Sequence, residues 1–251
     1  MEGEDLKRKE LAIISELLSF EEFARFYHDE WEHRNISIEL KIDPSYQNFA
    51  MYSKDNNKPF IKIKEQPKTS DNAFLVAHEM CHAIRDFDGN AINFGAKRPS
   101  NYREEELFDM SSKLGSMVDD PLADSCLQKY GFDPARFYTN VLIPASVESL
   151  RAGGDQSHDW HIFKNALLYS QYALQWDSIK DSSEWDKLKE QYKIRRPKVT
   201  KIGEELYFIS NENGYDDPEK QRQLFNKIFN KYTIRRDKIH CDKLSDILCI
   251  V

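Results

Sequence analysis

The chain has few cysteines, and they do not form a recognisable cluster. Its 251 residues include 4 cysteines, with no Cys-x-x-Cys pair among them. A structural zinc site built only from cysteines is therefore not expected. Scattered cysteines in a chain of this length are typical of reduced, intracellular thiols rather than of a disulfide framework.

The chain also has no long apolar run. No stretch approaches the roughly 20 apolar residues that a membrane-spanning helix needs. The sequence begins MEGEDLKRKE, which is charged and has no apolar region of the kind found in secretory signals. We therefore expect a cytoplasmic protein without a membrane partner.

An excess of positive charge is absent too. The formal net charge is −7 and the isoelectric point is about 5.6. Binding to nucleic acid needs a concentrated positive field, so no nucleic-acid partner is expected. The hydrophobic content of 40% and the charged content of 31% do not indicate disorder.

The hydrophobic periodicity predicts an α+β fold, with a mostly helical core and a small antiparallel sheet. The sheet is expected from strands at 36–42, 49–52 and 60–64, with Phe60–Lys64 as an exposed edge. Later elements are expected as helices near 101–118, 121–130, 160–176, 183–192 and 218–231, and as a strand at Glu205–Ser210. A change of composition predicts a boundary, with one domain over 1–180 and an α+β appendage of unknown role over 181–251.

The most informative motif is HEMCH, which comprises His78, Glu79, Met80, Cys81 and His82. Residues four apart share one face of a helix, so the two histidines can reach one metal ion. Imidazole nitrogen suits zinc. The glutamate after the first histidine can take a proton from a zinc-bound water as general base.

The surrounding sequence favours a buried helix for this motif. On a helix, His78, Glu79, His82 and Arg85 form one polar lane. Apolar residues flank this lane on two sides, which is typical of a helix inside a domain. Ser70 and Asp71 are candidate N-caps, and Gly89 is a candidate stop. Cys81 is expected to be a small buried filler.

Two histidines do not complete a catalytic zinc site, and the third ligand is expected to be a carboxylate. No histidine occurs between His82 and His158. The candidates lie in REEELF and in MVDDPLADSCLQKYG, and include Glu105, Asp119, Asp120 and Asp124.

The stretch DPLADSCLQKYG, at 120–131, resembles the E-x-x-A-D second helix of the zinc endopeptidases that include CAAX-prenyl proteases. The resemblance implies that Asp120 is the third zinc ligand, although the pattern has Glu there, and that Asp124 supports a ligand histidine. The order of helix, strands, HExxH helix and second helix is also similar to that of small soluble prokaryotic zincins, the minigluzincin-like metallopeptidases, some of which cleave repressor proteins.

Two alternatives to Asp120 stay open. Asp-Pro is a common helix start, with Asp at the N-cap and Pro at the first helical position, and the chain repeats the D-D-P form at Asp217. Glu105 competes as the ligand, because its spacing from His82 is within the range of the glutamate zincins.

His158 and His161, in SHDWHIF, are candidate catalytic residues. Hydrolases of this type use a hydrogen-bond donor for the developing oxyanion, and histidine can supply it. The competing interpretation is two surface histidines at the start of a helix.

The sequence therefore predicts a soluble zinc metallopeptidase acting on a peptide or protein substrate, with zinc as cofactor and Glu79 as general base. The alternative is a non-catalytic, regulatory interaction protein that keeps a zincin fold. Hydrolysis of a non-peptide amide is a third option.

Overall fold

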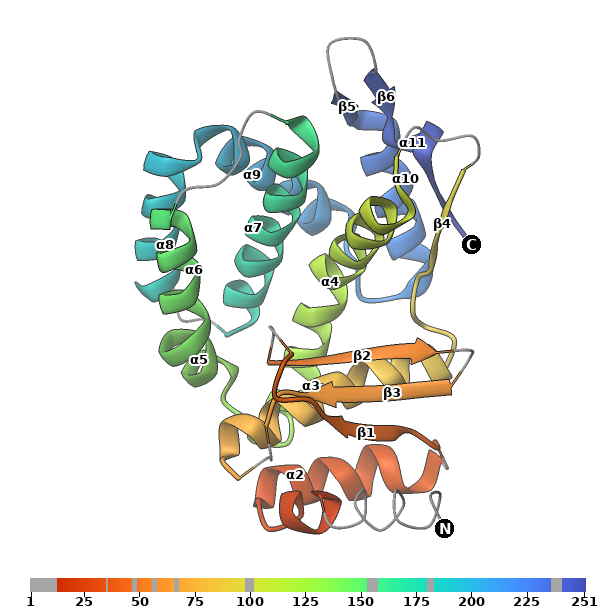
Figure 1. Cartoon of the computed structure of the whole chain (residues 1–251), viewed down its shortest axis with the longest axis vertical. Coiled ribbons are helices and arrows are strands. Elements are labelled where there is room, and N and C mark those ends of the chain that lie inside the picture. The colour runs from red at the N-terminus through yellow and green to blue at the C-terminus, as the bar shows by residue number, and fades with distance from the viewer. Residues whose placement is uncertain are drawn as a thin grey trace. The chain divides into compact units, whose positions relative to one another are not determined.

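A computed structural model describes residues 13–34, 36–46, 49–55, 58–65, 68–97, 102–152, 158–179, 183–235 and 241–251. Over these residues the fold is mostly helical, with three small sheets (Figure 1). This agrees with the α+β class expected from the sequence. No described helix is long and apolar enough to cross a membrane.

The chain divides into two compact units. The first unit comprises Met1–Gly89 and Ala123–Pro134, and the second comprises Asn90–Leu122 and Ala135–Val251. The boundary predicted near residue 181 lies inside the second unit. There, the helices after the boundary pack against helices before it, so residues 183–235 are part of a larger helical body.

The first unit contains a three-stranded sheet and the helices packed on it (Figure 1). Its described elements, in chain order, are α2 (Glu21–Phe26), η1 (Tyr27–Trp31), η2 (Glu32–Arg34), β1 (Glu39–Ile42), β2 (Ala50–Asp55), β3 (Lys58–Ile63) and α3 (Ser70–Phe87).

The sheet has the order β1-β3-β2. β2 pairs antiparallel with β3, but β1 pairs parallel with β3, so the predicted antiparallel meander is wrong for β1. β2 and β3 are consecutive in the sequence, so their antiparallel pairing is local. The position of β1 depends on its pairing with β3 beyond β2, and the periodicity does not encode that pairing. Phe60–Lys64 was predicted as an edge, yet β3 is the central strand and β2 lies at an edge.

The inner face of the sheet packs on α3. Leu40, Ile61 and Ile63 are buried, and the facing side of α3 contributes buried residues such as Val76 and Met80. Alternate residues of a strand point to opposite faces, which is why the period of two in the sequence located these strands.

The predicted helix around HEMCH is confirmed, but its cap is a different residue. Thr69, rather than Ser70 or Asp71, is the N-cap, and its side chain accepts a hydrogen bond from the Asn72 N–H. At the other end, Gly89 has a φ of 72°, a conformation that favours glycine. The helix between these two ends contains the whole HEMCH motif.

The second unit is built mainly from helices. Its elements are β4 (Phe94–Ala96), α4 (Glu104–Gln128, whose last turns belong to the first unit), α5 (Pro134–Phe137), η3 (Tyr138–Leu142), α6 (Ile143–Ala152), α7 (Asp159–Ile179), α8 (Ser183–Arg195), α9 (Pro197–Asn213), α10 (Pro218–Lys231), β5 (Thr233–Arg235), β6 (Cys241–Lys243), α11 (Leu244–Ile247) and β7 (Leu248–Ile250).

Helices α7 and α9 pack closely within this unit. A Cβ atom added to Gly203 on α9 would lie 2.5 Å from the Tyr169 ring on α7, so glycine permits this approach. The strand predicted at Glu205–Ser210 is wrong, because this segment belongs to α9. Its buried residues Val199, Gly203, Leu206 and Ser210 recur at helical spacing.

Helix α4 is one continuous helix, which corrects the prediction of two helices separated at Asp120-Pro121. Pro121 lies inside it. Proline in a helix interior removes one backbone hydrogen bond, which is why the sequence favoured a break there. The helix passes from the second unit into the first between Leu122 and Ala123.

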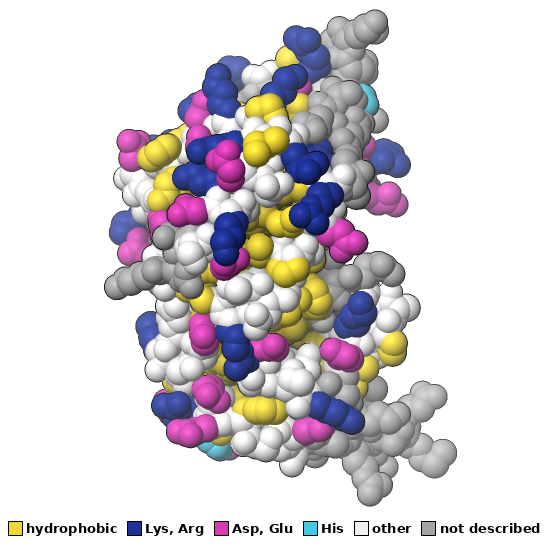
Figure 2. Space-filling view, turned by 90° about the vertical axis from the view of Figure 1, so that its left-hand side faces the viewer, with side chains coloured by type: hydrophobic (Ala, Val, Ile, Leu, Met, Phe, Trp, Pro, Cys, Tyr) yellow, Lys and Arg dark blue, Asp and Glu magenta, His cyan; other side chains and the backbone are white. Residues whose placement is uncertain are grey.

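Acidic and basic side chains are mixed on the surface. On the face that Figure 2 shows, described Lys and Arg side chains are interspersed with Asp and Glu side chains. The mixture agrees with the modest net charge of −7.

Candidate metal centre

Helix α3 places His78, Glu79 and His82 on its polar lane. His78 is 7% exposed. Its ring centroid lies 5.8 Å from that of Phe74 and 4.9 Å from that of His82. The two imidazoles therefore sit together one helical turn apart, as the motif predicts.

Asp124 holds the first of these histidines. Its side chain is fully buried, and its Oδ1 lies 3.1 Å from His78 Nδ1. A carboxylate accepts hydrogen bonds, so the hydrogen is on Nδ1 and the lone pair of Nε2 is left for a metal ion. Asp124 is the residue that the resemblance implied for this supporting position.

Asp120 completes a group of three possible metal ligands with His78 and His82. One ligand atom from each residue lies within 4.8 Å of the others. Asp120 stands one turn before Asp124 on the uninterrupted helix α4, so the contact between Asp124 and His78 fixes where Asp120 can lie. Because α4 does not begin at Asp120, the helix-cap interpretation of this residue is wrong.

The donor set fits a divalent metal ion. Ligand atoms on one tetrahedral zinc ion lie roughly 3.3 Å apart, given zinc–ligand distances of about 2.0–2.1 Å. Two imidazoles and one carboxylate also match the ligand types that leave a fourth position open for chemistry. The group of His78, His82 and Asp120 could therefore hold a metal ion.

Helix α7 orients Asp120. Gln171, which is 7% exposed, donates from Nε2 to Asp120 Oδ2 at 2.6 Å. Burial raises the pKa of the neighbouring Tyr172 to about 12, and the negative charge of Asp120 contributes to this rise. The sequence alone does not indicate a role for Gln171, because nothing near a lone glutamine on an amphipathic helix reveals its partner.

Glu79 lies beside the edge strand of the sheet. Its Oε2 accepts a hydrogen bond from the Tyr52 N–H at 2.6 Å, so β2 runs past the carboxylate. The glutamate side chain is thereby held on the sheet side of α3. Tyr52 was predicted to lie in a strand, but its contact with Glu79 was not foreseen.

Two free thiols lie where α3 and α4 meet. Cys81 on α3 is buried and Cys126 on α4 is partly buried, and each thiol influences the pKa of the other. Burial raises the pKa of Cys81, whereas the hydrogen bond with Cys81 lowers the pKa of Cys126. Cys81 was expected to be a filler, and the structure adds this pairing.

The other predicted site residues lie elsewhere. Glu105 is exposed in the first turn of α4, 15 residues before Asp120, or about 22 Å along the axis at 1.5 Å per residue. Asp119 is not a member of the group. The structure therefore brings neither of them together with the two motif histidines among the described residues.

His158 precedes α7 and His161 lies in its first turn, with their ring centroids 6.1 Å apart. His161 is 10 residues before Gln171, or about 15 Å along the helix axis. The described part of the structure does not bring these two histidines into the metal-ligand group, and their oxyanion role stays a prediction.

Comparison of the chain with protein-family models, with curated proteins and with solved structures gives no match. The class of the site is therefore defined by its own residues, as a two-histidine, one-carboxylate group with an adjacent glutamate.

Proposed function

We propose that this protein is a zinc-dependent metallopeptidase. The observation that carries the proposal is the group of His78, His82 and Asp120 directly beside Glu79. A structural metal site needs no glutamate at that place, whereas hydrolysis needs a base next to the metal.

The residues take distinct roles in this proposal. His78, His82 and Asp120 hold the ion, with Asp124 fixing the His78 ring. Zinc in such a site supplies a Lewis acid that acidifies water and polarises a carbonyl group. Glu79 accepts the proton of the attacking water and delivers it to the leaving amine. The Tyr52 N–H, bound to one carboxylate oxygen of Glu79, restrains that side chain and leaves the other oxygen to act as the base.

The edge strand supports a peptide as the substrate. β2 is at an edge of its sheet and passes directly beside Glu79. An extended peptide can add to the remaining backbone groups of such an edge, beyond the Tyr52 N–H that Glu79 occupies, through hydrogen bonds that recognise any sequence. This arrangement favours peptide bonds over small amides as the target.

The experiment is proteolysis by the zinc-loaded full chain on a broad peptide mixture. We expect cleavage that a chelator stops and added zinc restores. Glu79→Gln should reduce the rate by about 10²–10⁴-fold, the usual contribution of a general base, with zinc content unchanged. Glu190→Gln, at an exposed position on α8, is the matched control and should cleave like the wild type.

Zinc binding without any cleavage of the mixture would contradict the proposal. That outcome would favour the non-catalytic interaction protein that keeps the metal as a structural element.

A further inference from the structure

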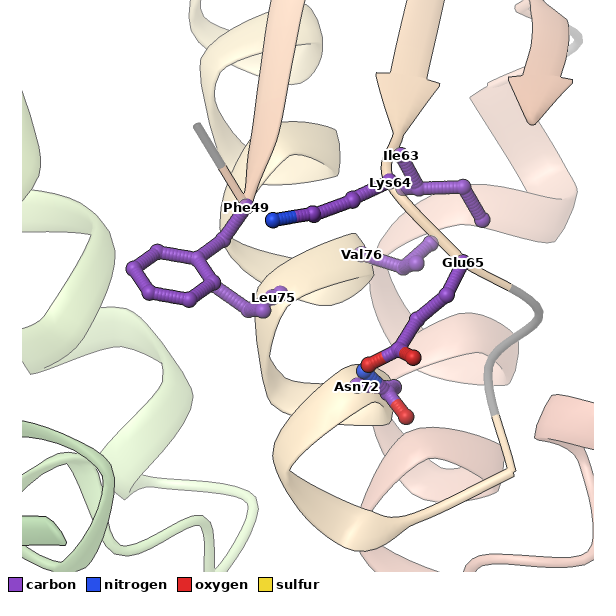
Figure 3. A pocket seen from close by; sticks show the side chains of 7 residues that line it. All are labelled: Phe49, Ile63, Lys64, Glu65, Asn72, Leu75 and Val76. Carbon is purple, nitrogen blue, oxygen red and sulfur yellow. The ribbon is translucent and has the colours of Figure 1, made fainter. Parts of the chain in front are cut away.

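A small cavity lies at one end of the sheet in the first unit, between the strands and the N-terminal half of α3 (Figure 3). Its volume is about 200 Å³. A cavity of about 150 Å³ can bind benzene, whereas pockets for larger ligands begin near 300 Å³. The cavity therefore has room for one large side chain.

Part of its wall is apolar. Ile63 from the end of β3 and Val76 from α3 are 4% and 1% exposed, and they form the buried part. Leu75 on α3 and Phe49, just before β2, complete the wall. Phe49 is 38% exposed, and its ring lies beside Leu75 in Figure 3. A large apolar side chain entering here would cover that ring.

Polar groups surround the walls. Lys64, Glu65 and Asn72 also line the cavity, and Glu65 points toward Asn72 in Figure 3. One positive and one negative charge give little preference for a charged occupant. The apolar part of the wall, formed by Phe49, Ile63, Leu75 and Val76, therefore favours an uncharged side chain.

One residue of the cavity wall, Phe49, directly precedes the strand that passes Glu79. Lys64 N–H donates to the Phe49 carbonyl oxygen at 3.0 Å, so Phe49 and Lys64 form a hydrogen-bonded pair. In an antiparallel ladder the hydrogen-bonded pairs alternate. Tyr52, opposite Ile61, therefore turns its backbone groups away from β3, as its bond to Glu79 confirms. Ala50 falls on the same alternation and faces the same edge.

The separation from the base is short. Phe49 precedes Tyr52 by three residues, or about 10 Å of strand at about 3.3 Å per residue. Leu75 precedes Glu79 by one turn, or about 6 Å of helix at 1.5 Å per residue. A peptide strand that follows β2 from Glu79 reaches the cavity within about three of its own residues.

We propose that this cavity binds a Leu-, Met- or Phe-sized side chain of the substrate peptide, within three residues of the cleaved bond. The substrate class is then a peptide with a large apolar residue at that position. This inference rests on the peptidase activity proposed above, and it adds the specificity of the same site.

The test is to sequence the products that the zinc-loaded full chain makes from a peptide mixture, and to compare residue preferences at three positions on each side of the cleaved bond. The wild type should prefer Leu, Met or Phe at one of these positions. Leu75→Trp fills the cavity and should shift that position toward Ala or Ser. The ratio of kcat/KM values should change by about 10–200-fold, the usual range for apolar pockets that differ in size.

Phe49→Ala is the second variant, because it opens the wall without filling the core, and it should weaken the same preference. Phe87→Ala, at an exposed position of α3 outside the cavity, is the matched control and should keep the wild-type preference. Cleavage that depends on Glu79 but shows the same preferences in Leu75→Trp and Phe49→Ala would overturn the cavity assignment alone. Absence of all cleavage would overturn the proposed function and the assignment with it.

Discussion

Two of the three metal-ligand candidates are oriented by a buried polar partner. Asp124 binds the Nδ1 of His78, and Gln171 donates to Asp120. Such partners fix the orientation of a ligand and commonly change metal affinity when they are removed. The geometry of the group therefore depends on residues outside the HEMCH motif.

We predict that Gln171→Leu lowers zinc affinity by about 10–100-fold, the usual effect of losing a supporting partner. The physical reason is that Asp120 loses the donor that holds its Oδ2. A competition titration with a chelating dye measures the effect. Gln175→Leu is the matched control: Gln175 is also buried on α7, one turn later, but it donates to Tyr138. Equal loss of affinity in both variants would show that Gln171 acts only through folding.

The paired thiols give a pH prediction. The lowered pKa of Cys126 increases its reactive thiolate form, so its alkylation should begin at a lower pH than that of an ordinary thiol. Cys81, whose pKa is raised by burial, should stay unmodified over the same range. In Cys81→Ala the hydrogen bond is lost, and the pH midpoint for alkylation of Cys126 should rise. Mass spectrometry of iodoacetamide-treated protein measures both sites, with Cys249→Ala as the control. An unchanged midpoint in Cys81→Ala would contradict this account.

At the residue scale, site geometry could be predicted from the sequence where it depends on residues within one helix. The spacing of His78 and His82 within one helix determines their shared face. The partner of Asp120 could not be predicted, because Gln171 is 51 residues away and the contact depends on how α4 and α7 pack.

At the scale of elements, the same tripeptide form has two different outcomes. Asp217 caps α10, and its side chain accepts hydrogen bonds from the Glu219 and Lys220 N–H groups. Asp120, in the other D-D-P sequence, lies inside α4. The sequence predicted α10 over 218–231 correctly, but local rules cannot distinguish a helix start from a proline that the surrounding helix tolerates.

This contrast is testable. Asp217→Ala should lower the free energy of unfolding by about 1 kcal/mol, the typical cost of losing an N-cap, with zinc content unchanged. Asp120→Ala removes no cap and should instead remove zinc. Urea denaturation and metal analysis of the two variants measure both effects. A loss of zinc in Asp217→Ala would argue against separate roles for the two aspartates.

The sheet shows the other limit of prediction at this scale. Alternation located its three strands, but the parallel pairing of β1 with β3 joins segments separated by β2. That pairing made β2, rather than Phe60–Lys64, the strand beside Glu79.

At the scale of the whole molecule, composition predicted the α+β class, and the structure divides the chain into two compact units. The second unit combines residues from both sides of the predicted boundary at 181, because α8 and α9 pack with α7. Linear changes in composition cannot show that a helix such as α4 belongs to two units in succession.

The central claim is that one metal ion is bound by His78, His82 and Asp120. The most direct test is the zinc content of the purified full chain, measured by elemental mass spectrometry after dialysis, for wild type, Asp120→Ala and Glu105→Ala. We predict one zinc ion per chain for the wild type and for Glu105→Ala, and almost none for Asp120→Ala. Equal zinc in all three proteins, or loss in Glu105→Ala alone, would contradict the account.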